Sequence, residues 1–194
     1  MGRAVVVIHS RLDGSEPRWL TAGAGGPAAS GFPDGLPKRA RCVWLVRSED
    51  LVLVERTLGL RRRDLEQALP FALEEDLLAD PGEYAFAYGR RDGRTGIAAA
   101  DRDRLLAGYE ALRSRRLGPA AIVPDVLALP LEDGAWTALL DGDRVLVRTG
   151  WATGFACSPD NLPLILERTL QEGEGEPGRL LLHGDETALP PVPL

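Results

Sequence analysis

The chain has 194 residues with 44% hydrophobic content, 27% charged residues and a formal net charge of −6. This length and hydrophobic content allow the chain to bury its own core, which excludes an intrinsically disordered protein and suits one domain or two small lobes. The acidic balance argues against nucleic-acid binding through a general basic field, and no apolar run reaches the roughly 18 to 20 residues that a membrane-spanning helix needs.

The first two thirds of the chain alternate strand and helix patterns. Apolar residues at 1–8 predict a strand, and the glycine-, alanine- and proline-rich residues 22–37 predict a mobile loop. Two β-rich runs around the turn signal Ser48-Glu49-Asp50 predict neighbouring strands at 42–47 and 51–58. The further elements expected here are a helix at 61–78, a hairpin of strands at 84–88 and 95–100 joined by Asp92-Gly93, a helix from Asp101 to residue 117, and a short buried strand at 120–123 leading into a helical turn at 124–129.

The last third predicts a meander of three strands followed by a helix and a strand. A tight hairpin is expected at Asp141-Gly142, because this pair accepts positive φ angles, and Ser158-Pro-Asp160 offers a helix cap. The expected elements are strands at 135–140, 144–149 and 152–157, a helix at 161–171, a loop at 172–178 and a strand at 179–183. A boundary between two lobes is expected near 131–134.

The segment from Gln67 to Asp80 is helical in composition, yet it contains Pro70 and ends in a cluster of acids. On a helical wheel an apolar stripe forms and runs out near its last member; the members are Leu65, Ala68, Leu69, Ala72 and Leu73. Pro70 has no N–H to donate, so either the helix kinks there or a second helix starts with Pro70 at its first position. The acids beyond the stripe are either a solvated face or a surface for a basic partner; they are Glu74, Glu75, Asp76 and Asp80.

Several sequence blocks resemble the cytoplasmic region of type II secretion system protein L (GspL), and they occur in that family's order. The most specific are Ala68-Leu-Pro-Phe-Ala-Leu-Glu74 and Val123-Pro-Asp-Val-Leu-Ala-Leu-Pro130. The resemblance covers residues 42–166, whereas residues 1–41 match only as a strand followed by a variable loop. The other blocks are Leu45–Leu53, Trp136–Gly150 and Gly154–Ala156.

This resemblance implies an actin-like ATPase (ribonuclease H-like) fold of the α/β class, with mixed sheets in two lobes and a degenerate nucleotide site. Residues 1–131 would form the first actin-like lobe, and residues 132–194 would form the incomplete start of the second. The implied function is that of a non-catalytic adaptor, which binds the N-terminal domain of the secretion ATPase GspE and needs no cofactor, metal or catalytic residue.

The same resemblance implies a location and further partners. The domain would lie at the cytoplasmic face of the bacterial inner membrane, anchored by a segment outside this chain, and would meet the platform proteins GspM and GspF and a second copy of itself. The four acids Glu74, Glu75, Asp76 and Asp80 are then the candidate partner-binding residues. The alternatives are an active actin-like nucleotide-binding ATPase and a small kinase of the same fold.

An actin-like ATPase grips phosphates with an acidic, glycine-containing loop at the start of each half, and two segments are candidates. Asp13-Gly14-Ser15 follows the first strand, but residues 9–12 separate the acid from the strand end. Asp141-Gly142-Asp143 lacks the run of small residues that lets a phosphate approach the backbone. Asp185 stands where this fold often has a second glycine near the adenine, and its side chain would crowd that approach. These features favour ordinary turns.

The remaining polar candidates favour structural roles. His9 and His183 each close a β-rich run and are interpreted as strand-end side chains rather than catalytic bases. Cys42 and Cys157 are far apart and flanked by apolar residues, which predicts two buried reduced thiols rather than a disulfide. No Cys/His pair has ligand spacing, so a zinc site is not supported. The arginine clusters at 61–63 and 113–116 are either a solvated face or a contact with lipid or a partner.

Overall fold

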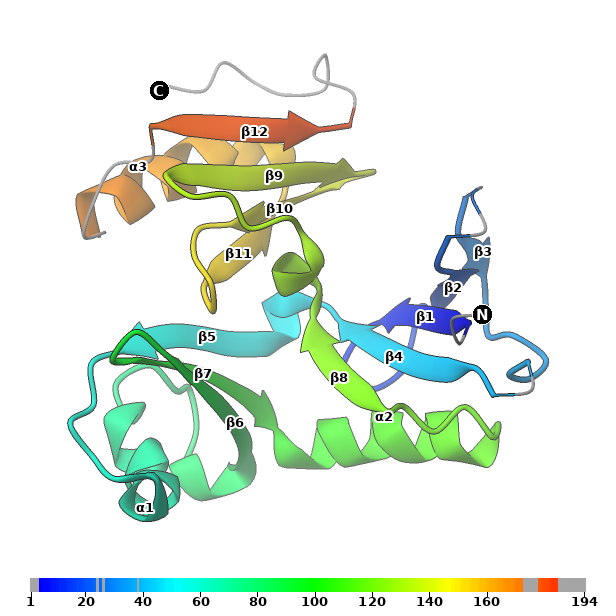
Figure 1. Cartoon of the computed structure of the whole chain (residues 1–194), viewed down its shortest axis with the longest axis horizontal. Coiled ribbons are helices and arrows are strands. Elements are labelled where there is room, and N and C mark those ends of the chain that lie inside the picture. Colours follow the sequence, from blue (N-terminus) through cyan, green and yellow to red (C-terminus); the bar gives the residue numbers. More distant parts are fainter. Residues whose placement is uncertain (1–3, 24, 26, 38, 173–177, 185–194) are drawn as a thin grey trace. The chain divides into compact units, whose positions relative to one another are not determined.

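The computed structural model describes residues 4–184 apart from residues 24, 26, 38 and 173–177 (Figure 1). The chain separates into two units, Met1–Asp125 and Val126–Leu194. The first unit contains a five-stranded and a three-stranded sheet, and the second contains a four-stranded sheet. The sequence pattern placed a boundary near 131–134, and the assignment of residues 1–131 and 132–194 to two actin-like lobes stays a prediction.

The five-stranded sheet of the first unit is mixed and has the order β3-β2-β1-β4-β8. Three strands run parallel, namely β1 (Val5–Ser10), β4 (Arg41–Val46) and β8 (Ala121–Pro124). The antiparallel strands β2 (Arg18–Thr21) and β3 (Ala29–Ser30) extend the sheet beyond β1. The predicted loop at 22–37 therefore contains one short strand.

One face of this sheet packs on helix α2 (Arg102–Ser114). Alternate residues of β1 and β4 are buried, as expected for strands with one covered face, and Trp44 lies at the centre of the core. The Trp44 indole N–H donates a hydrogen bond to the Ser10 hydroxyl at 2.8 Å, so the buried polar group of this large side chain is satisfied. Helix α2 begins as predicted, because the Asp101 carboxylate accepts a hydrogen bond from the Arg104 amide.

The three-stranded sheet is antiparallel and has the order β5-β7-β6. Its strands are β5 (Leu51–Arg56), β6 (Tyr84–Arg91) and β7 (Arg94–Asp101), and the short 3-10 helix η2 (Pro81–Glu83) precedes β6. The β6–β7 hairpin confirms the predicted turn, with positive φ at both Asp92 and Gly93. Helix α1 (Arg62–Ala72) covers one face of the sheet through buried residues of the predicted stripe, namely Leu65, Leu69 and Leu73.

Three local predictions for the first unit are wrong. Strands β4 and β5 are not neighbours: Ser48–Asp50 is a 3-10 helix, η1, that carries the chain from the five-stranded to the three-stranded sheet. Helix α1 ends at Ala72 rather than near residue 78, and Pro70 lies inside its last turn without starting a new helix. Strand β8 is an edge strand, so its residues Ala121 and Ile122 are exposed instead of buried.

The second unit confirms the predicted meander. Its mixed sheet has the order β11-β10-β9-β12, with strands β9 (Ala135–Asp141), β10 (Arg144–Arg148), β11 (Gly154–Cys157) and β12 (Arg179–His183). Helix α3 (Leu162–Glu172) packs Leu162 and Leu166 on Trp136, Ala138, Val145 and Val147. The 3-10 helices η3 (Asp125–Ala128) and η4 (Pro159–Asn161) precede the sheet and α3. The stretch Ser158-Pro-Asp160, predicted to cap the helix, enters η4 instead, and the Ser158 side chain makes no capping hydrogen bond there.

The four-stranded sheet repeats the topology of the five-stranded sheet. In both, three consecutive antiparallel strands form a meander, and the next strand of the sheet pairs in parallel with the first strand of the meander. The strands β1, β2, β3 and β4 thus correspond in order to β9, β10, β11 and β12. Such a repeat of mixed sheets agrees with the two-half architecture that the family resemblance implies.

The packing of α2 on the sheet leaves no space for a side chain at Gly108. A Cβ there would collide with the carbonyl oxygen of Leu12 and lie 2.6 Å from Cη2 of Trp44. We expect Gly108→Ala to lower the free energy of unfolding by about 2 kcal/mol, although alanine favours a helix over glycine. Urea denaturation measures this loss. Gly118→Ala is the control, since its Cβ would meet its nearest neighbour at 4.0 Å; equal stability of the two variants would contradict the packing.

Candidate functional site

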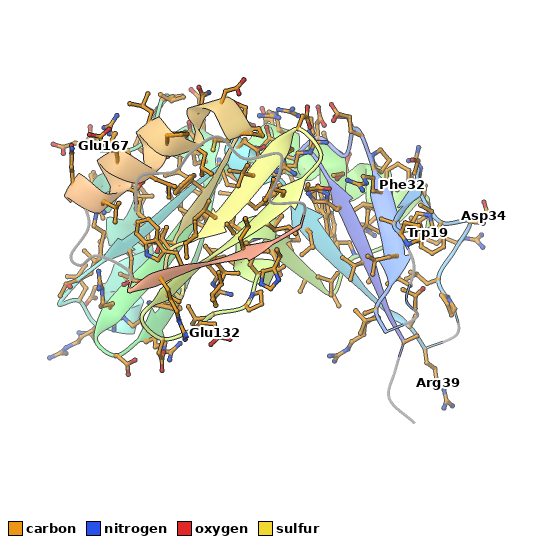
Figure 2. All side chains as sticks on the ribbon, turned by 90° about the horizontal axis from the view of Figure 1, so that it is seen from above. Trp19, Phe32, Asp34, Arg39, Glu132 and Glu167 are labelled. Carbon is orange, nitrogen blue, oxygen red and sulfur yellow. The ribbon has the colours of Figure 1, made fainter. Side chains whose placement is uncertain are left out.

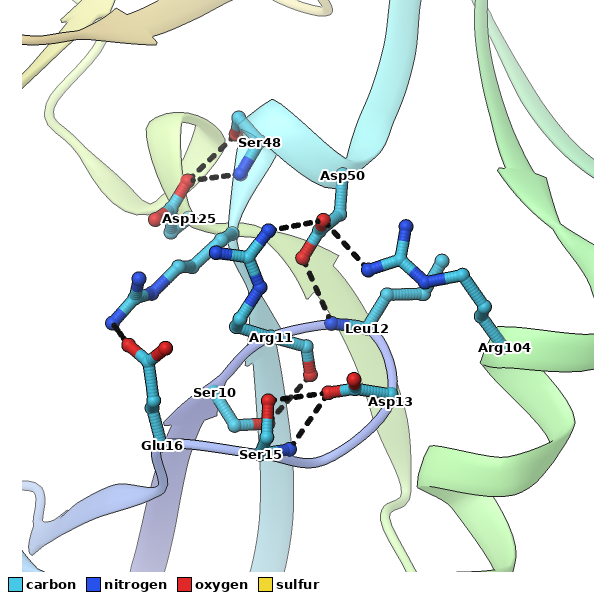
Figure 3. Close-up of polar contacts among 11 residues, drawn as sticks. Ser10, Arg11, Leu12, Asp13, Ser15, Glu16, Ser48, Asp50, Arg104 and Asp125 are labelled. Atoms are coloured by element: carbon cyan, nitrogen blue, oxygen red, sulfur yellow. Dashed lines mark hydrogen bonds and ion pairs between the residues drawn. The ribbon is translucent and has the colours of Figure 1, made fainter.

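The carboxyl ends of β1, β4 and β8 meet at one edge of the five-stranded sheet. Ligands of open α/β sheets bind at this edge, so it is where a nucleotide site would be sought. Figure 3 shows that polar side chains from the segments following these strands gather there and bond to one another. The edge therefore holds a network of the protein's own charged groups.

Asp50 of η1 is the centre of this network. Its side chain is 3% exposed and accepts hydrogen bonds from Arg104 Nη2 at 2.8 Å, Arg11 Nη2 at 3.0 Å and the Leu12 amide at 3.0 Å (Figure 3). Burial raises the pKa of Asp50, but the hydrogen bonds from Arg104 and Leu12 and the two guanidinium charges outweigh it, so the pKa lies below its ordinary value. Asp50 therefore stays ionised and holds the loop after β1.

The first candidate phosphate loop, Asp13-Gly14-Ser15, is a closed turn. Asp13 Oδ1 accepts hydrogen bonds from the Ser15 hydroxyl at 2.6 Å and the Ser15 amide at 2.9 Å, and these bonds lower the pKa of Asp13. The amide of Gly14 donates to the Arg11 carbonyl at 3.0 Å. Together with the Leu12 amide on Asp50, these N–H groups already have acceptors within the protein. A phosphate would have to displace them to be gripped by this backbone.

A second carboxylate at the same edge, Asp125, is also buried and joins β1 to η1. It accepts hydrogen bonds from the Ser48 hydroxyl at 2.6 Å and the Ser48 amide at 3.0 Å, and it lies 3.0 Å from His9 Nε2. The carboxylate stands between the serine and the histidine, so this arrangement differs from a triad in which the histidine activates the serine. His9 lies near the end of β1 as predicted, but its pairing with Asp125 could not be found from the sequence.

The second candidate phosphate loop is an ordinary hairpin turn between β9 and β10. Gly142 has φ +66°, and Asp141 lies 3.8 Å from Arg144 across the turn. Gly184 follows β12 with φ +111°, and a Cβ there would lie 3.1 Å from the Leu140 Cβ. Asp185 lies outside the described residues. His183 is the exposed last residue of β12.

The four predicted partner-binding acids lie after α1 rather than on it. Glu74 and Glu75 are exposed and form no ion pair with any residue that the structure describes. Asp76 instead makes two hydrogen bonds with Arg56 Nη2, at 2.8 and 3.0 Å. Asp80 caps η2 by accepting from the Gly82 amide at 2.7 Å. Two of the four acids thus stabilise the local fold, and two are exposed without such partners.

The charges at the ends of α1 have the signs that interact unfavourably with its macrodipole. Cations stabilise a helix C-terminus and anions an N-terminus, yet Arg61 and Arg63 stand at the N-terminus and Glu74 and Glu75 follow the C-terminus. Arg61 also provides no side-chain cap. Only Asp64 in the first turn has the favourable sign. Helix stability therefore does not explain these charges.

The basic cluster at the C-terminus of α2 has the opposite character. Its cations suit the dipole, and two of them pack on aromatic rings. The Arg115 guanidinium lies 4.6 Å from the centre of the Phe32 ring, and that of Arg113 lies 5.9 Å from the centre of the Tyr109 ring. The position of the cluster at a helix C-terminus was expected from the sequence, whereas its contacts with aromatic rings were not.

The two thiols and two apolar side chains near α1 differ in how far they are buried. Both cysteines are free as predicted, and Cys42 is buried, but Cys157 is half-buried rather than buried. Burial raises the pKa of Cys42 to about 11. Phe71 is 78% exposed and Leu78 is 99% exposed. Sequence analysis did not identify these two as functional candidates, although both stand off the apolar stripe that predicted the buried face of α1.

The fold and the closed sheet edge define a class of protein: an actin-like domain of mixed α/β architecture whose usual ligand-binding edge is filled by its own side chains. The family model described as Type II secretion system (T2SS), protein L, matches residues 34–174. The chain belongs to the type II secretion system protein L family, and the resemblance found in the sequence is confirmed.

Curated relatives agree with this assignment. The chain is 34% identical over 116 residues to the type II secretion system protein L of Dickeya chrysanthemi, which covers 58% of this chain and 29% of that protein. It is 31% identical to the Vibrio cholerae protein L over 137 residues, and 32% identical to that of Klebsiella pneumoniae over 165 residues. These matches cover 69% and 79% of this chain, but only 33% and 41% of the relatives.

Solved structures confirm the fold. The cytoplasmic domain of EpsL, an inner membrane component of the type II secretion system of Vibrio cholerae, matches with TM-score 0.76 and 22% identity over 96% of this chain and 87% of that chain. A chain of the PilM–PilN type IV pilus biogenesis complex matches with TM-score 0.57 and 13% identity, over 86% of this chain and 66% of that one. A Bacteroides thetaiotaomicron protein with an actin-like ATPase fold matches with TM-score 0.51 and 10% identity, over 94% and 82%.

Within residues 4–184 and their stated gaps, no helix is long and apolar enough to cross a membrane. The anchoring segment outside this chain stays a prediction.

The Asp50 network makes stability depend on pH. Because the folded-state pKa of Asp50 is lowered, its contribution is present above the unfolded-state pKa of about 3.9 and is lost as pH falls through the folded-state pKa. We expect Asp50→Asn to lower the free energy of unfolding by about 1–2 kcal/mol at pH 7, since both arginines are partly screened by solvent. The difference from the unsubstituted protein should shrink below about pH 4.

Urea denaturation at pH 7 and at pH 3 measures this difference. Asp34→Asn is the control, because Asp34 is exposed on the loop after β3 (Figure 2). A loss for Asp50→Asn that is equal at both pH values would show that the ionised carboxylate is not what stabilises this edge.

Proposed function

We propose that this domain is a non-catalytic adaptor of the type II secretion system. It binds the N-terminal domain of the secretion ATPase GspE at the cytoplasmic face of the bacterial inner membrane. The observation that carries the proposal is the closed edge of the five-stranded sheet, where backbone N–H groups that could grip phosphates are bonded to Asp13 and Asp50. An adaptor needs only a complementary surface, whereas an ATPase needs open phosphate loops and an acid that positions water.

The docking surface of this proposal is the acidic segment after α1. Glu74 and Glu75 supply its charge, because they are exposed and have no ion pair among the described residues. Asp76 and Asp80 add negative charge but hold Arg56 and η2 in place. The platform proteins GspM and GspF and a second copy of the chain are further partners in this proposal. Full-length relatives extend well beyond the matched region, and the membrane anchor is assigned to such an extension.

Charge reversal at the docking surface tests this proposal. We expect Glu74→Lys with Glu75→Lys to slow association with the GspE N-terminal domain about tenfold at low salt and to weaken its salt dependence, because acids that steer a basic partner act on the association rate. Thermal stability should change little, since both side chains are exposed. Surface plasmon resonance at low and high salt measures the rates.

The matched control reverses two acids of the second unit, Glu132→Lys with Glu167→Lys. Both side chains are exposed, as Figure 2 shows, and the change in net charge is the same. If the control slows association as much as the test variant, overall charge rather than the acidic segment steers the partner. If neither variant changes association, the interface lies elsewhere on the domain.

The alternative functions, an actin-like ATPase and a small kinase, require nucleotide binding. We expect no heat of binding with Mg-ATP in isothermal titration and no hydrolysis above background, because the amides of the Asp13 loop are engaged within the protein. The same titration with the GspE N-terminal domain serves as the positive arm. Saturable Mg-ATP turnover that Asp141→Ala or Asp13→Ala abolishes would establish the alternative.

A further inference from the structure

Phe71 and Leu78 are the most exposed of the large hydrophobic side chains among the described residues. Phe71 is 78% exposed and Leu78 is 99% exposed, whereas the next is Leu164 at 70%. A single exposed apolar residue is normal on a protein surface. These two, however, lie within eight residues of each other, and the exposed acids Glu74 and Glu75 lie between them.

Neither Phe71 nor Leu78 packs in the core of the three-stranded sheet. Phe71 lies two residues from Leu69 and two from Leu73, so its direction on the helix is about 200° from theirs and away from the buried stripe. At the other end, the neighbouring Leu77 packs against the core, and Leu78 does not. The packing of this unit is thus complete without Phe71 and Leu78.

The backbone between them is ordered by a tight turn. The amides of Asp76 and Leu77 both donate to the Leu73 carbonyl, at 2.8 and 3.1 Å, and the Asp76 carboxylate is held by Arg56. The segment that carries the two apolar side chains is therefore fixed before any partner arrives, which reduces the entropy lost on binding.

We propose that Phe71 and Leu78 are the apolar anchors of the acidic docking surface. The partner they fit carries apolar sockets rimmed by lysine or arginine. This inference rests on the proposed function and assigns the contacts within it. Phe71 and Leu78 hold the bound complex, while Glu74 and Glu75 steer its formation.

The charge of the docking surface favours this partner over a second copy of the chain and over an anionic membrane. A second copy of the chain would bring the same acids against Glu74 and Glu75, and like charges across an interface oppose association. An anionic leaflet would repel these acids as well, because its surface potential is negative. A basic protein face is the partner that the charges favour, and the negative partial charge at the C-terminus of α1 adds to this preference.

Rate constants separate anchors from steering groups. We expect Phe71→Ala with Leu78→Ala to weaken binding of the GspE N-terminal domain about 30-fold, chiefly through faster dissociation, since buried anchors contribute most of the binding energy of an interface. Association should change less than about threefold, in contrast to the double charge reversal. Surface plasmon resonance gives both rates, and thermal denaturation should show an unchanged midpoint because both residues are exposed.

Leu164→Ala in α3 is the control for removing an exposed apolar side chain, and its dissociation rate should equal that of the unsubstituted chain. If the GspE domain does not bind the unsubstituted chain, the proposed function fails and this inference with it. If it binds and the double alanine variant dissociates at the original rate, the anchors are overturned while the adaptor function stands. If the double alanine variant instead loses self-association in sedimentation velocity, or loses flotation with phosphatidylglycerol vesicles, one of the rejected occupants is the right one.

Discussion

The buried carboxylate of Asp50 constrains the arrangement of the first unit more than any other polar group. It stands on the short helix between β4 and β5, which belong to different sheets, and it accepts hydrogen bonds from the loop after β1 and from α2. A buried charge is tolerated only when it is paired and hydrogen-bonded, so each partner must lie where Asp50 can reach it. The positions of the β1 loop, α2 and the crossing between the sheets are coupled in this way.

The same constraint bears on ligand binding. In an actin-like fold the loops at this edge have to leave amides open for phosphates, but here the amide of Leu12 is bonded to Asp50 and that of Ser15 to Asp13. A bound phosphate would have to compete with carboxylates that are already in place and that carry the same charge sign. The network thus stabilises the fold with backbone groups that a nucleotide would require, and this arrangement is what supports the proposed adaptor function.

Much of the secondary structure could be predicted, because its signals are local. The β6–β7 turn follows from Asp92-Gly93, the start of α2 from Asp101, and the buried face of α1 from the spacing of Leu65, Leu69 and Leu73. Membership of a sheet has no local signal, so β4 and β5 were wrongly expected to be neighbours. The early end of α1 was missed although the apolar stripe runs out near Leu73, because the residues after it have no glycine or proline stop signal before Pro81, whereas the chain turns at Leu73.

The candidate site was predictable only in outline. The sequence identified the acidic segment, but it could not show that Asp76 is held by Arg56, because these two residues are 20 positions apart. The cap at Asp80 had a local signal that was missed, namely an acid followed by a proline at the first helical position. Pairings such as His9 with Asp125, separated by 116 residues, depend on the fold and were not foreseen. Phe71 had a local signal, because it stands off the apolar stripe of α1, but a single exposed apolar residue is common and does not by itself indicate a contact.

The charges at the two ends of α1 create an electric field that acts on an approaching molecule. Arginines at one end and glutamates beyond the other give the side chains of this segment a dipole of their own, which is parallel to that of the peptide groups, so that the two add. In the field of such a dipole, a molecule whose own positive and negative ends are separated experiences a torque before contact. If the proposed partner docks on this segment, α1 favours one angular orientation of the approaching molecule over its reverse.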